Sequence, residues 1–362
     1  MAIAELRTHR VSASLHTPFV TALRRTTTTD TVVVELVDSD GRRGFGEAPQ
    51  VWQVTGESLA GAQACLDGPL RDVLVGADPD DLVSLLRRVR GAVHANHGAK
   101  AAADIALHDL AARRLGVPLA RYLGGSAGTV RTDVTLSVGS PDELVDAAKA
   151  RVADGFDVLK VKVGTDAAGD VARVVAIREA VGPRVRIRLD ANQGWTPREA
   201  VRAMRAIEDS GAAVELVEQP VAGHDLVGLA HVTANIDTPT LADEAVYGVR
   251  DLLAVVERRA ADMVNVKLAK CGGLGPARTL LELAREAGLG TMVGSMMETH
   301  VGIGAAASLV AAYPTTAIGD LDAAWWLTDP PVAGGVRYDG PVVTLPDAPG
   351  LGIDALLDSA AS

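Results

Sequence analysis

The stretch VLKVKV, residues 158–163, is the first of five short apolar segments that carry charged residues at their ends. The others are RLDANQGW around Asp190, VEQP around Glu218, ADE around Asp243 and NVKLAKCGG around Lys267. From Lys162 onward, successive charged residues lie 28, 28, 25 and 24 positions apart. A (β/α)8 barrel spends roughly 30 residues on each strand-plus-helix unit. The five segments are therefore predicted to be consecutive strands whose carboxyl ends face one mouth.

The alternation of strand and helix patterns continues from about residue 129 to the region of residue 320. Amphipathic helices are expected at residues 141–153, 171–181, 197–210 and 274–287. Strands are expected at 130–138, 158–163, 185–189, 214–217, 240–241, 263–267, 290–293 and 316–318. Eight strands in this alternation favour a closed parallel barrel over an open sheet. The predicted fold class is α/β, with a modified (β/α)8 barrel.

The two ends of the chain do not follow the barrel rhythm. Residues 31–37 and 45–47 flank an Asp-Gly turn and predict a hairpin, and helices are expected at about 57–73, 80–93 and 100–115. We expect an α+β capping domain at residues 1–122, the barrel at 123–330, and a tail at 331–362 that packs back on the capping domain.

Composition restricts the classes of partner. The formal net charge is −11 and no block of lysine and arginine stands out, so nucleic acid and anionic membrane surfaces are not expected partners. The sequence shows neither a secretion signal nor an apolar run of about 18 residues. Two isolated cysteines, Cys65 and Cys271, show no disulfide pattern, and a cytoplasmic location is expected.

The three carboxylates predict a metal site. Asp190, Glu218 and Asp243 each follow an apolar strand, where barrel residues are typically catalytic. Hard oxygen ligands at one mouth suit Mg²⁺, which leaves coordination positions for substrate oxygens.

The lysines on either side of these carboxylates predict acid–base chemistry. Lys160 and Lys162 lie two positions apart on one strand and point to one face, whereas Lys267 lies far around the barrel. We expect desolvation and neighbouring positive charge to lower a lysine pKa toward neutrality. One lysine on each face of a carbon next to a carboxylate would remove a proton from one side and return it on the other, which inverts the configuration.

This set of residues resembles the enolase superfamily, and within it the muconate-lactonizing subgroup. The resemblance covers nearly the whole chain and rests on Lys160 and Lys162, the three carboxylates, and the lysine in NVKLAKCGG. It implies that Lys162 and Lys267 are the acid–base catalysts and that Asp190, Glu218 and Asp243 hold Mg²⁺. Lys160 would contact the substrate carboxylate.

Within the subgroup, residues 318–322 resemble the segment that binds the free α-amino group in dipeptide epimerases. Asp320 and Asp322 form an anionic pair suited to an ammonium group. The run PFVTALR, residues 18–24, is similar to the segment in which an arginine selects an acidic substrate side chain. This implies a role for Arg24, although the adjacent Arg25 remains an alternative. Further substrate contacts implied by the resemblance are Thr135, Ser295, Met297 and Glu298.

The resemblance implies Mg²⁺-dependent epimerisation of a dipeptide at its C-terminal residue, with L-Ala-D/L-Glu or a close relative as substrate and recycling of cell-wall peptide as the role. A muconate-type cycloisomerase, or an N-acylamino acid racemase with o-succinylbenzoate synthase activity, is the alternative in the same fold, and neither needs an ammonium site. A non-catalytic binding protein is the alternative from another class. We also expect a symmetric homo-oligomer.

Overall fold

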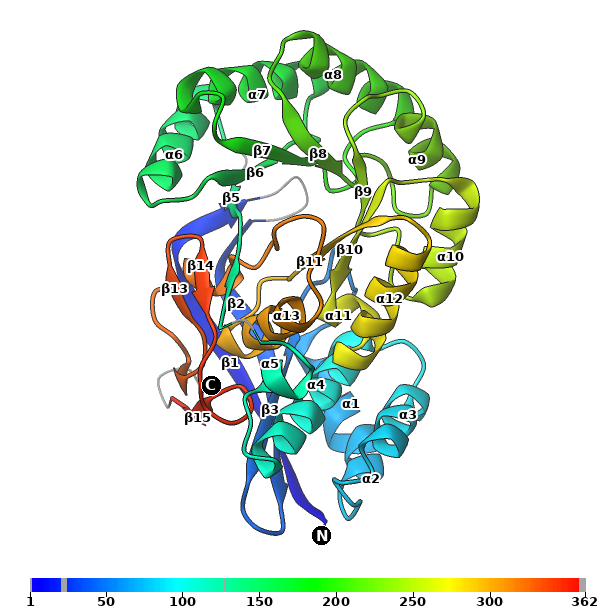
Figure 1. The fold of residues 1–362 in the computed structure, drawn as a ribbon, viewed down its shortest axis with the longest axis vertical. Coiled ribbons are helices and arrows are strands. Elements are labelled where there is room, and N and C mark those ends of the chain that lie inside the picture. Colours follow the sequence, from blue (N-terminus) through cyan, green and yellow to red (C-terminus); the bar gives the residue numbers. More distant parts are fainter. Residues whose placement is uncertain (1, 21–24, 127, 138, 358–362) are drawn as a thin grey trace.

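A computed structural model describes residues 2–20, 25–126, 128–137 and 139–357. Its centre is a sheet of seven parallel strands in the order β11-β10-β9-β8-β7-β6-β5, which curls into a barrel (Figure 1). Neighbouring strands in the sheet are therefore also consecutive along the chain, as predicted for a (β/α)8 barrel. The strands are β5 (Val134–Leu136), β6 (Val158–Lys162), β7 (Arg186–Asp190), β8 (Val214–Glu218), β9 (Thr240–Ala242), β10 (Met263–Lys267) and β11 (Gly290–Gly294).

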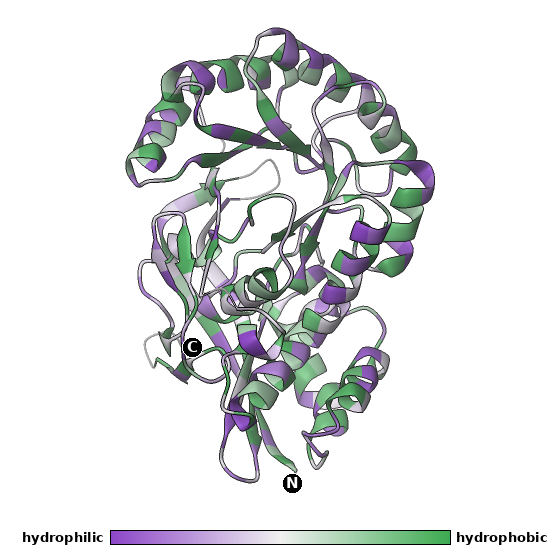
Figure 2. Ribbon diagram, viewed as in Figure 1, coloured by the Kyte–Doolittle hydropathy of each residue, from purple (hydrophilic) through white to green (hydrophobic). Residues whose placement is uncertain are grey.

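Helices cover the outside of this sheet and present their apolar faces to it (Figure 2). Two of them begin with capping boxes, in which Ser140 and Thr196 accept from the third helical residue and a glutamate side chain accepts in return. Each such cap stabilises a helix by about 1 kcal/mol. The helices are α6 (Pro141–Ala153), α7 (Ala167–Val181), α8 (Pro197–Asp209), α9 (Leu226–Thr233), α10 (Val249–Arg258), the short α11 (Leu268–Cys271) and α12 (Leu274–Glu286).

The eighth position of the barrel differs from the prediction of a strand at 316–318. This segment forms isolated parallel bridges, Gly294 with Asp320 on one side and Thr132 with Gly319 on the other. The amide N–H groups of Asp320 and Asp133 donate to Val293 and Gly319 respectively. The barrel is thus closed between β11 and β5 by hydrogen bonds of single residues, because the segment turns at once into the helical turn η2 (Ala323–Trp326).

The N-terminal region forms an antiparallel sheet backed by helices. Its strands are β1 (Ile3–Val20), β2 (Arg25–Asp38) and β3 (Arg43–Pro49), and its helices are α1 (Leu59–Cys65), η1 (Leu66–Leu70), α2 (Arg71–Leu74), α3 (Leu82–Ala92), α4 (His97–Arg114) and α5 (Leu119–Tyr122). The predicted helix at 57–73 is interrupted at Gly68, whose backbone is not helical and which precedes Pro69. The predicted hairpin is confirmed, but β1 was not predicted.

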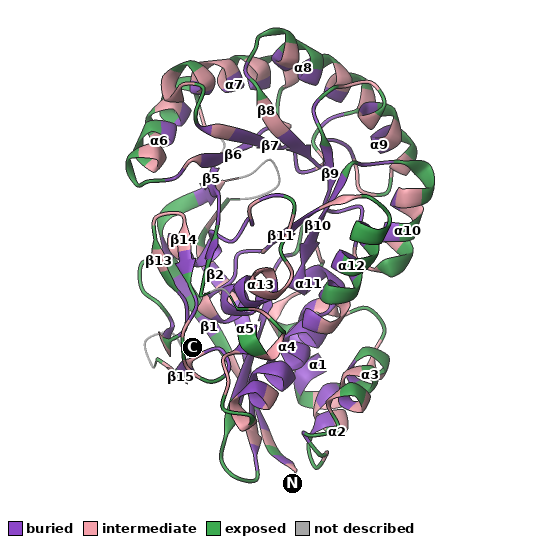
Figure 3. Ribbon diagram, in the orientation of Figure 1, coloured by how far each residue is buried: buried purple, intermediate pink, exposed green. Residues whose placement is uncertain are grey.

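Helix α4 lies almost wholly buried between this sheet and the barrel (Figure 3). Two glycines of β3 allow it to approach the sheet so closely. A Cβ atom at Gly46 would lie 1.9 Å from the carbonyl oxygen of Ala102, and one at Gly44 would lie 2.3 Å from that of Ala106. Because β3 runs directly into the loop over the barrel mouth, this packing sets the position of that loop.

The last part of the chain contacts both regions. Strand β14 (Val342–Thr344) pairs with β13 (Arg337–Asp339) and with β4 (Thr129–Arg131), and β12 (Val332–Gly334) pairs with β15 (Ile353–Leu356). The predicted strand at 130–138 is therefore divided into β4, which pairs with the tail, and β5, which belongs to the barrel. The tail also contacts α4, since Asp109 accepts from the amide of Leu351 and Arg113 donates to the carbonyl of Ile353. The domain limits at residues 122 and 330 stay a prediction.

Among the described residues, no helix combines the length and the apolar character that crossing a membrane requires.

His300 begins α13 (His300–Ala312) and is half-buried against the tail, with its ring edge-on to Tyr338 at 6.5 Å. Burial lowers its pKa to about 4. His300 is therefore protonated below about pH 6.5 in the unfolded chain, but only below about pH 4 in the folded chain.

We predict that stability falls as the pH is lowered through this window, by on the order of 2 kcal/mol from this residue. His300→Gln should remove that part of the pH dependence, and His94→Gln, at an exposed position, should leave it intact. Denaturant unfolding at pH 7 and pH 4.5 measures the free energy of unfolding at each pH. An equal loss of unfolding free energy between the two pH values in wild type and His300→Gln would contradict the assignment.

Candidate active site

Strand register places the predicted site residues side by side at the carboxyl ends of the barrel strands. Lys162 is paired with Asp190 across β6 and β7, and Asp190 is paired with Glu218 across β7 and β8. Asp243 follows β9, and Lys267 ends β10. Because neighbouring parallel strands keep the same register, residues some 28 positions apart in the sequence become lateral neighbours.

Lys160 is the most heavily paired cation at this mouth. Its buried Nζ lies 3.0 Å from Asp190 Oδ2, 2.7 Å from Glu218 Oε2 and 2.7 Å from Asp320 Oδ2. Burial opposes its charge, but these carboxylates outweigh burial and hold the pKa of Lys160 well above its ordinary value. Lys160 is therefore a fixed positive charge and an anchor for anions, and its amine does not serve as a base in this state.

The other two lysines lie on opposite sides of the carboxylates. Lys162 Nζ is 2.6 Å from Asp190 Oδ2, and Lys267 Nζ is 2.8 Å from Asp243 Oδ2. We expected a lowered lysine pKa, and for Lys267 this is wrong. Burial acts in the expected direction, but Asp243 and Glu218 outweigh it and raise the pKa of Lys267 above its ordinary range.

The pKa values of the three carboxylates are shifted in different directions. Burial and the neighbouring Asp190 raise the pKa of Glu218 to about 7. Burial also disfavours the charged forms of Asp190 and Asp243, but the lysine ammonium groups outweigh it and hold both pKa values below the ordinary range. Buried oxygen donors of this kind, crowded enough to repel one another, fit a hard divalent cation such as Mg²⁺.

Several residues that the sequence analysis missed hold these carboxylates in place. Lys270, one turn beyond Lys267, lies with its Nζ 2.5 Å from Asp243 Oδ1. Asn265 donates to Glu218 Oε1 at 2.9 Å, and the side-chain oxygen of Gln219 accepts from the amide of Asp243 at 2.9 Å. Gln219 has a φ of +35°, an uncommon conformation for a residue other than glycine. Lys270 alone carried a signal in the sequence, as the second lysine of NVKLAKCGG.

Asp320 and Asp322 lie at the same mouth, on the segment that closes the barrel. Asp322 Oδ2 accepts from the amide of Thr135 at 2.8 Å and from the indole N–H of Trp326 at 2.9 Å. The carbonyl of Asp320 accepts from the amide of Ser295 at 3.0 Å. Thr135 and Ser295 thus hold this segment from both sides, and both line the cavity that contains the lysines.

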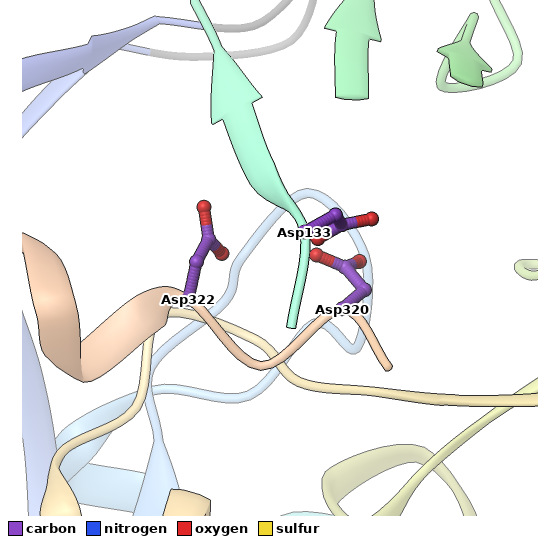
Figure 4. A group of neighbouring side chains, drawn as sticks. All are labelled: Asp133, Asp320 and Asp322. Atoms are coloured by element: carbon purple, nitrogen blue, oxygen red, sulfur yellow. The ribbon is translucent and has the colours of Figure 1, made fainter. Parts of the chain in front are cut away.

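A third acid, Asp133, belongs to the same cluster and was also missed. One carboxylate oxygen from each of Asp133, Asp320 and Asp322 lies within 4.8 Å of the others (Figure 4). This spacing alone would admit a metal ion, but cations and N–H donors already hold the three acids. Lys160 pairs with Asp320, and Arg188 pairs with Asp133 at 2.9 Å. Lysines likewise pair with Asp190, Glu218 and Asp243, so ion pairing alone does not distinguish the two groups of acids as metal sites.

The remaining predicted substrate contacts differ in what the structure says of them. Met297 lines the cavity, whereas Glu298 is not among its lining residues. Glu298 accepts from the amide of Met296, and burial beside Glu47 raises its pKa to about 8. Arg24 lies outside the described residues, and the alternative, Arg25, is exposed at the start of β2. These assignments stay predictions.

The N-terminal region contributes a loop to the cavity, and the residues of this loop were not named in the sequence analysis. Val51, Gln53 and Val54 line the cavity from the cap side. The hydroxyl of Tyr247, four residues after Asp243, donates to the carbonyl of Val54 at 2.5 Å. This bond joins the loop of the cap to the loop that carries a predicted metal ligand.

Both regions of the chain match known protein families. Residues 143–359 match the family described as enolase C-terminal domain-like. Residues 3–124 match the N-terminal domain of mandelate racemase and muconate lactonizing enzyme. The L-Ala-D/L-Glu epimerase of Bacillus subtilis (strain 168) is 42% identical over 354 residues, which cover 98% of this chain and 97% of the relative.

Solved structures agree with these matches. The substrate-liganded L-Ala-D/L-Glu epimerase from Bacillus subtilis superposes with a TM-score of 0.96 at 41% identity, covering 99% of this chain and 100% of the other. A dipeptide epimerase from Enterococcus faecalis V583, complexed with Mg and L-Leu-L-Tyr, gives 0.94 at 39% identity, covering 98% and 100%. The chain belongs to the mandelate racemase and muconate lactonizing enzyme family of the enolase superfamily.

Proposed function

We propose that the protein is a Mg²⁺-dependent dipeptide epimerase, an isomerase that inverts the α-carbon of the C-terminal residue. The observation that carries this proposal is the placement of Lys162 and Lys267 on β6 and β10, with three strands and the row of carboxylates between them. Relatives that are 39–42% identical over nearly the whole chain are epimerases, which supports the same reaction here.

Asp190, Glu218 and Asp243 would hold the Mg²⁺, which supplies positive charge to the substrate carboxylate and to the enediolate formed from it. Lys160 adds a second fixed charge at that carboxylate. Asp243 and Glu218 are also the carboxylates that favour the proton on Lys267, so their binding to a cation would weaken that effect.

Proton transfer then requires the two lysines in opposite states. The neutral amine of one lysine takes the α-proton. The electron pair of the broken Cα–H bond moves into the carboxylate and forms the enediolate. The ammonium group of the other returns a proton to the opposite face of the same carbon. In the reverse direction the two lysines exchange roles.

The other end of the substrate would be held by the acids of the closing segment. Asp320 and Asp322 suit the α-ammonium group of a dipeptide, and Thr135 and Ser295 hold them in place. We propose L-Ala-D/L-Glu or a near relative as substrate, with Arg24 contacting the acidic side chain and cell-wall peptide recycling as the role. Cys65 and Cys271 are both buried free thiols, which agrees with a reducing cytoplasm. We further propose that the protein works there as a homo-oligomer.

Replacing the ammonium-binding acids tests the substrate class. We expect Asp320→Asn and Asp322→Asn each to lower kcat/KM for L-Ala-L-Glu by at least 100-fold, because a buried ammonium group would lose its charged partner. Asp329→Asn, at an exposed position on the same segment, is the matched control. Epimerisation is followed by NMR. Wild-type rates in both site variants would favour a substrate without an ammonium group, as in a cycloisomerase or an N-acylamino acid racemase.

Replacing each lysine tests the two-base mechanism. Lys162→Ala and Lys267→Ala should each abolish epimerisation, because one face of the α-carbon loses its proton donor. Each variant should still exchange the α-proton for deuterium in one of the two diastereomers, and the two variants should do so in opposite diastereomers. Lys149→Ala, at an exposed position on α6, is the control. Loss of all exchange from both diastereomers in one variant, with full exchange in the other, would point to a single base.

Calorimetric titration with Mg²⁺ alone tests the metal site without reference to activity. We expect Asp243→Asn to weaken Mg²⁺ binding at least tenfold, since an amide is a poorer ligand for a hard cation. Asp133→Asn should leave the affinity unchanged. The opposite result, in which Asp133→Asn loses the metal and Asp243→Asn keeps it, would move the ion to the cluster of Asp133, Asp320 and Asp322.

A further inference from the structure

Asp133, directly before β5, is a fully buried acid. The proposed mechanism gives it no role. Its Oδ2 accepts from Arg188 Nη1 at 2.9 Å. Its Oδ1 is also buried and has no hydrogen-bond partner among the described residues. An ionised carboxylate with an unpartnered buried oxygen is costly, so this residue requires a physical explanation.

Arg188 connects Asp133 to the segment that carries the ammonium-binding acids. Its buried guanidinium donates through Nη1 to the carbonyl of Ile318 at 2.8 Å and through Nε to Glu215 Oε2 at 2.7 Å. Ile318 lies two residues before Asp320. The Arg188 side chain of β7 is therefore bonded to the barrel neighbour β8, to Asp133 and to the closing segment at the same time.

The backbone around Asp133 is bonded to that segment as well. The amide of Asp133 donates to the carbonyl of Gly319 at 3.0 Å, and the amide of Leu321 donates to the hydroxyl of Thr132 at 2.8 Å. Figure 4 shows the side chains of Asp133 and Asp320 next to each other at this seam. The chain at residues 132–133 is therefore bonded to the residues on both sides of Asp320.

The charges that face Asp133 come from three further elements. Asp320 and Asp322 lie on the closing segment, Lys160 projects from β6, and Arg188 projects from β7 with Glu215 of β8 on its far side. Burial and the carboxylate of Asp320 raise the pKa of Asp133 well above its ordinary value, and Arg188 opposes this without outweighing it. By contrast, burial at Asp320 is outweighed by Lys160 together with Lys267 and Lys162, which hold the pKa of that acid below its ordinary value.

We propose that Asp133 is a positioning residue whose neutral carboxyl group is bound to Arg188 through Oδ2 and directs the O–H of Oδ1 toward Asp320. This arrangement keeps Asp320 ionised and correctly placed for the substrate ammonium group, and it gives the otherwise unpartnered oxygen a hydrogen bond. The inference rests on the proposed function, because it assigns Asp133 to the ammonium site of a dipeptide epimerase.

A neutral and an ionised Asp133 predict opposite outcomes for one substitution. Asn has the shape of a protonated aspartate, with an oxygen to accept from Arg188 and an NH₂ group to donate to Asp320. If Asp133 is neutral, Asp133→Asn reproduces its hydrogen bonds. If Asp133 is ionised, Asp133→Asn removes a negative charge from the ammonium site and weakens the binding of the dipeptide.

The experiment measures kcat and KM for L-Ala-L-Glu in the Mg²⁺-loaded enzyme, together with thermal unfolding. We expect Asp133→Asn to keep KM within about threefold of wild type across pH 6–9. Asp133→Leu, of similar size but without hydrogen bonds, should raise KM at least tenfold and change kcat by less than threefold. If Asp133→Leu does not fold, Asp133→Ala takes its place, and Asp133→Asn decides between the two charge states in either case.

A tenfold rise in KM for Asp133→Asn would overturn the neutral carboxyl, and an unchanged KM for Asp133→Leu would overturn the positioning role. A lower kcat together with a lower melting temperature, with no change in KM, would also overturn the positioning role, since that result indicates a structural role only. The wild-type enzyme separates this inference from the proposed function. If wild type does not epimerise dipeptides, the function fails. If wild type does so and the Asp133 variants behave otherwise than stated, only the inference fails.

Discussion

The ammonium group of Lys160 is the interaction on which the mouth of the barrel depends. It contacts carboxylates from β7, β8 and the closing segment, so one buried cation on β6 joins the second position of the barrel to the third, fourth and last. Burying a lysine is costly, and only charged hydrogen-bond partners in good geometry offset that cost. The three acids are in turn tolerated in the interior because Lys160 is there. Neither the cation nor the acids would be stable at this place alone.

The same balance extends through the rest of the site. Lys162 and Lys267 pair with the outer carboxylates, Lys270 contacts the remaining oxygen of Asp243, and Arg188 compensates the lower cluster. The neighbouring carboxylates raise the pKa values of Lys160 and Lys267, and the lysines in turn lower the pKa values of Asp190 and Asp243. Binding of a cation to the acids changes the proton affinity of the lysines, so metal binding and acid–base function are physically coupled at this mouth.

The capping region takes part in the site through backbone contacts more than through charge. Gly44 and Gly46 let α4 approach β3, and the loop that follows β3 lies over the cavity. The hydroxyl of Tyr247 bonds that loop to the barrel. The cap loop is therefore bonded to the loop after β9 beside the cavity. The tail strengthens this arrangement, because Asp109 and Arg113 of α4 bond to its backbone.

Much of this architecture could be predicted because it depends on periodic features of the chain. The spacing from Lys162 to Lys267 specifies successive βα units, and parallel register then makes these residues neighbours. The hairpin at 31–47 and the helix starts at Ser140 and Thr196 follow from local turn and capping chemistry. The eighth strand could not be predicted correctly, because its hydrogen bonds come from single residues on two neighbours that are distant in sequence.

Sequence by itself determined the kind of chemistry, since residue types at a regular spacing bring carboxylates and amines to one end of a barrel. Only the tertiary structure decided the partners and protonation of each group. Asp133 looks unremarkable beside β5 in the sequence, and its contact with Asp320 spans 187 positions. Lys267 was expected to have a lowered pKa and has a raised one. The reason is that burial and charge act over a few ångströms in space, and these distances are set by the packing of segments far apart along the chain.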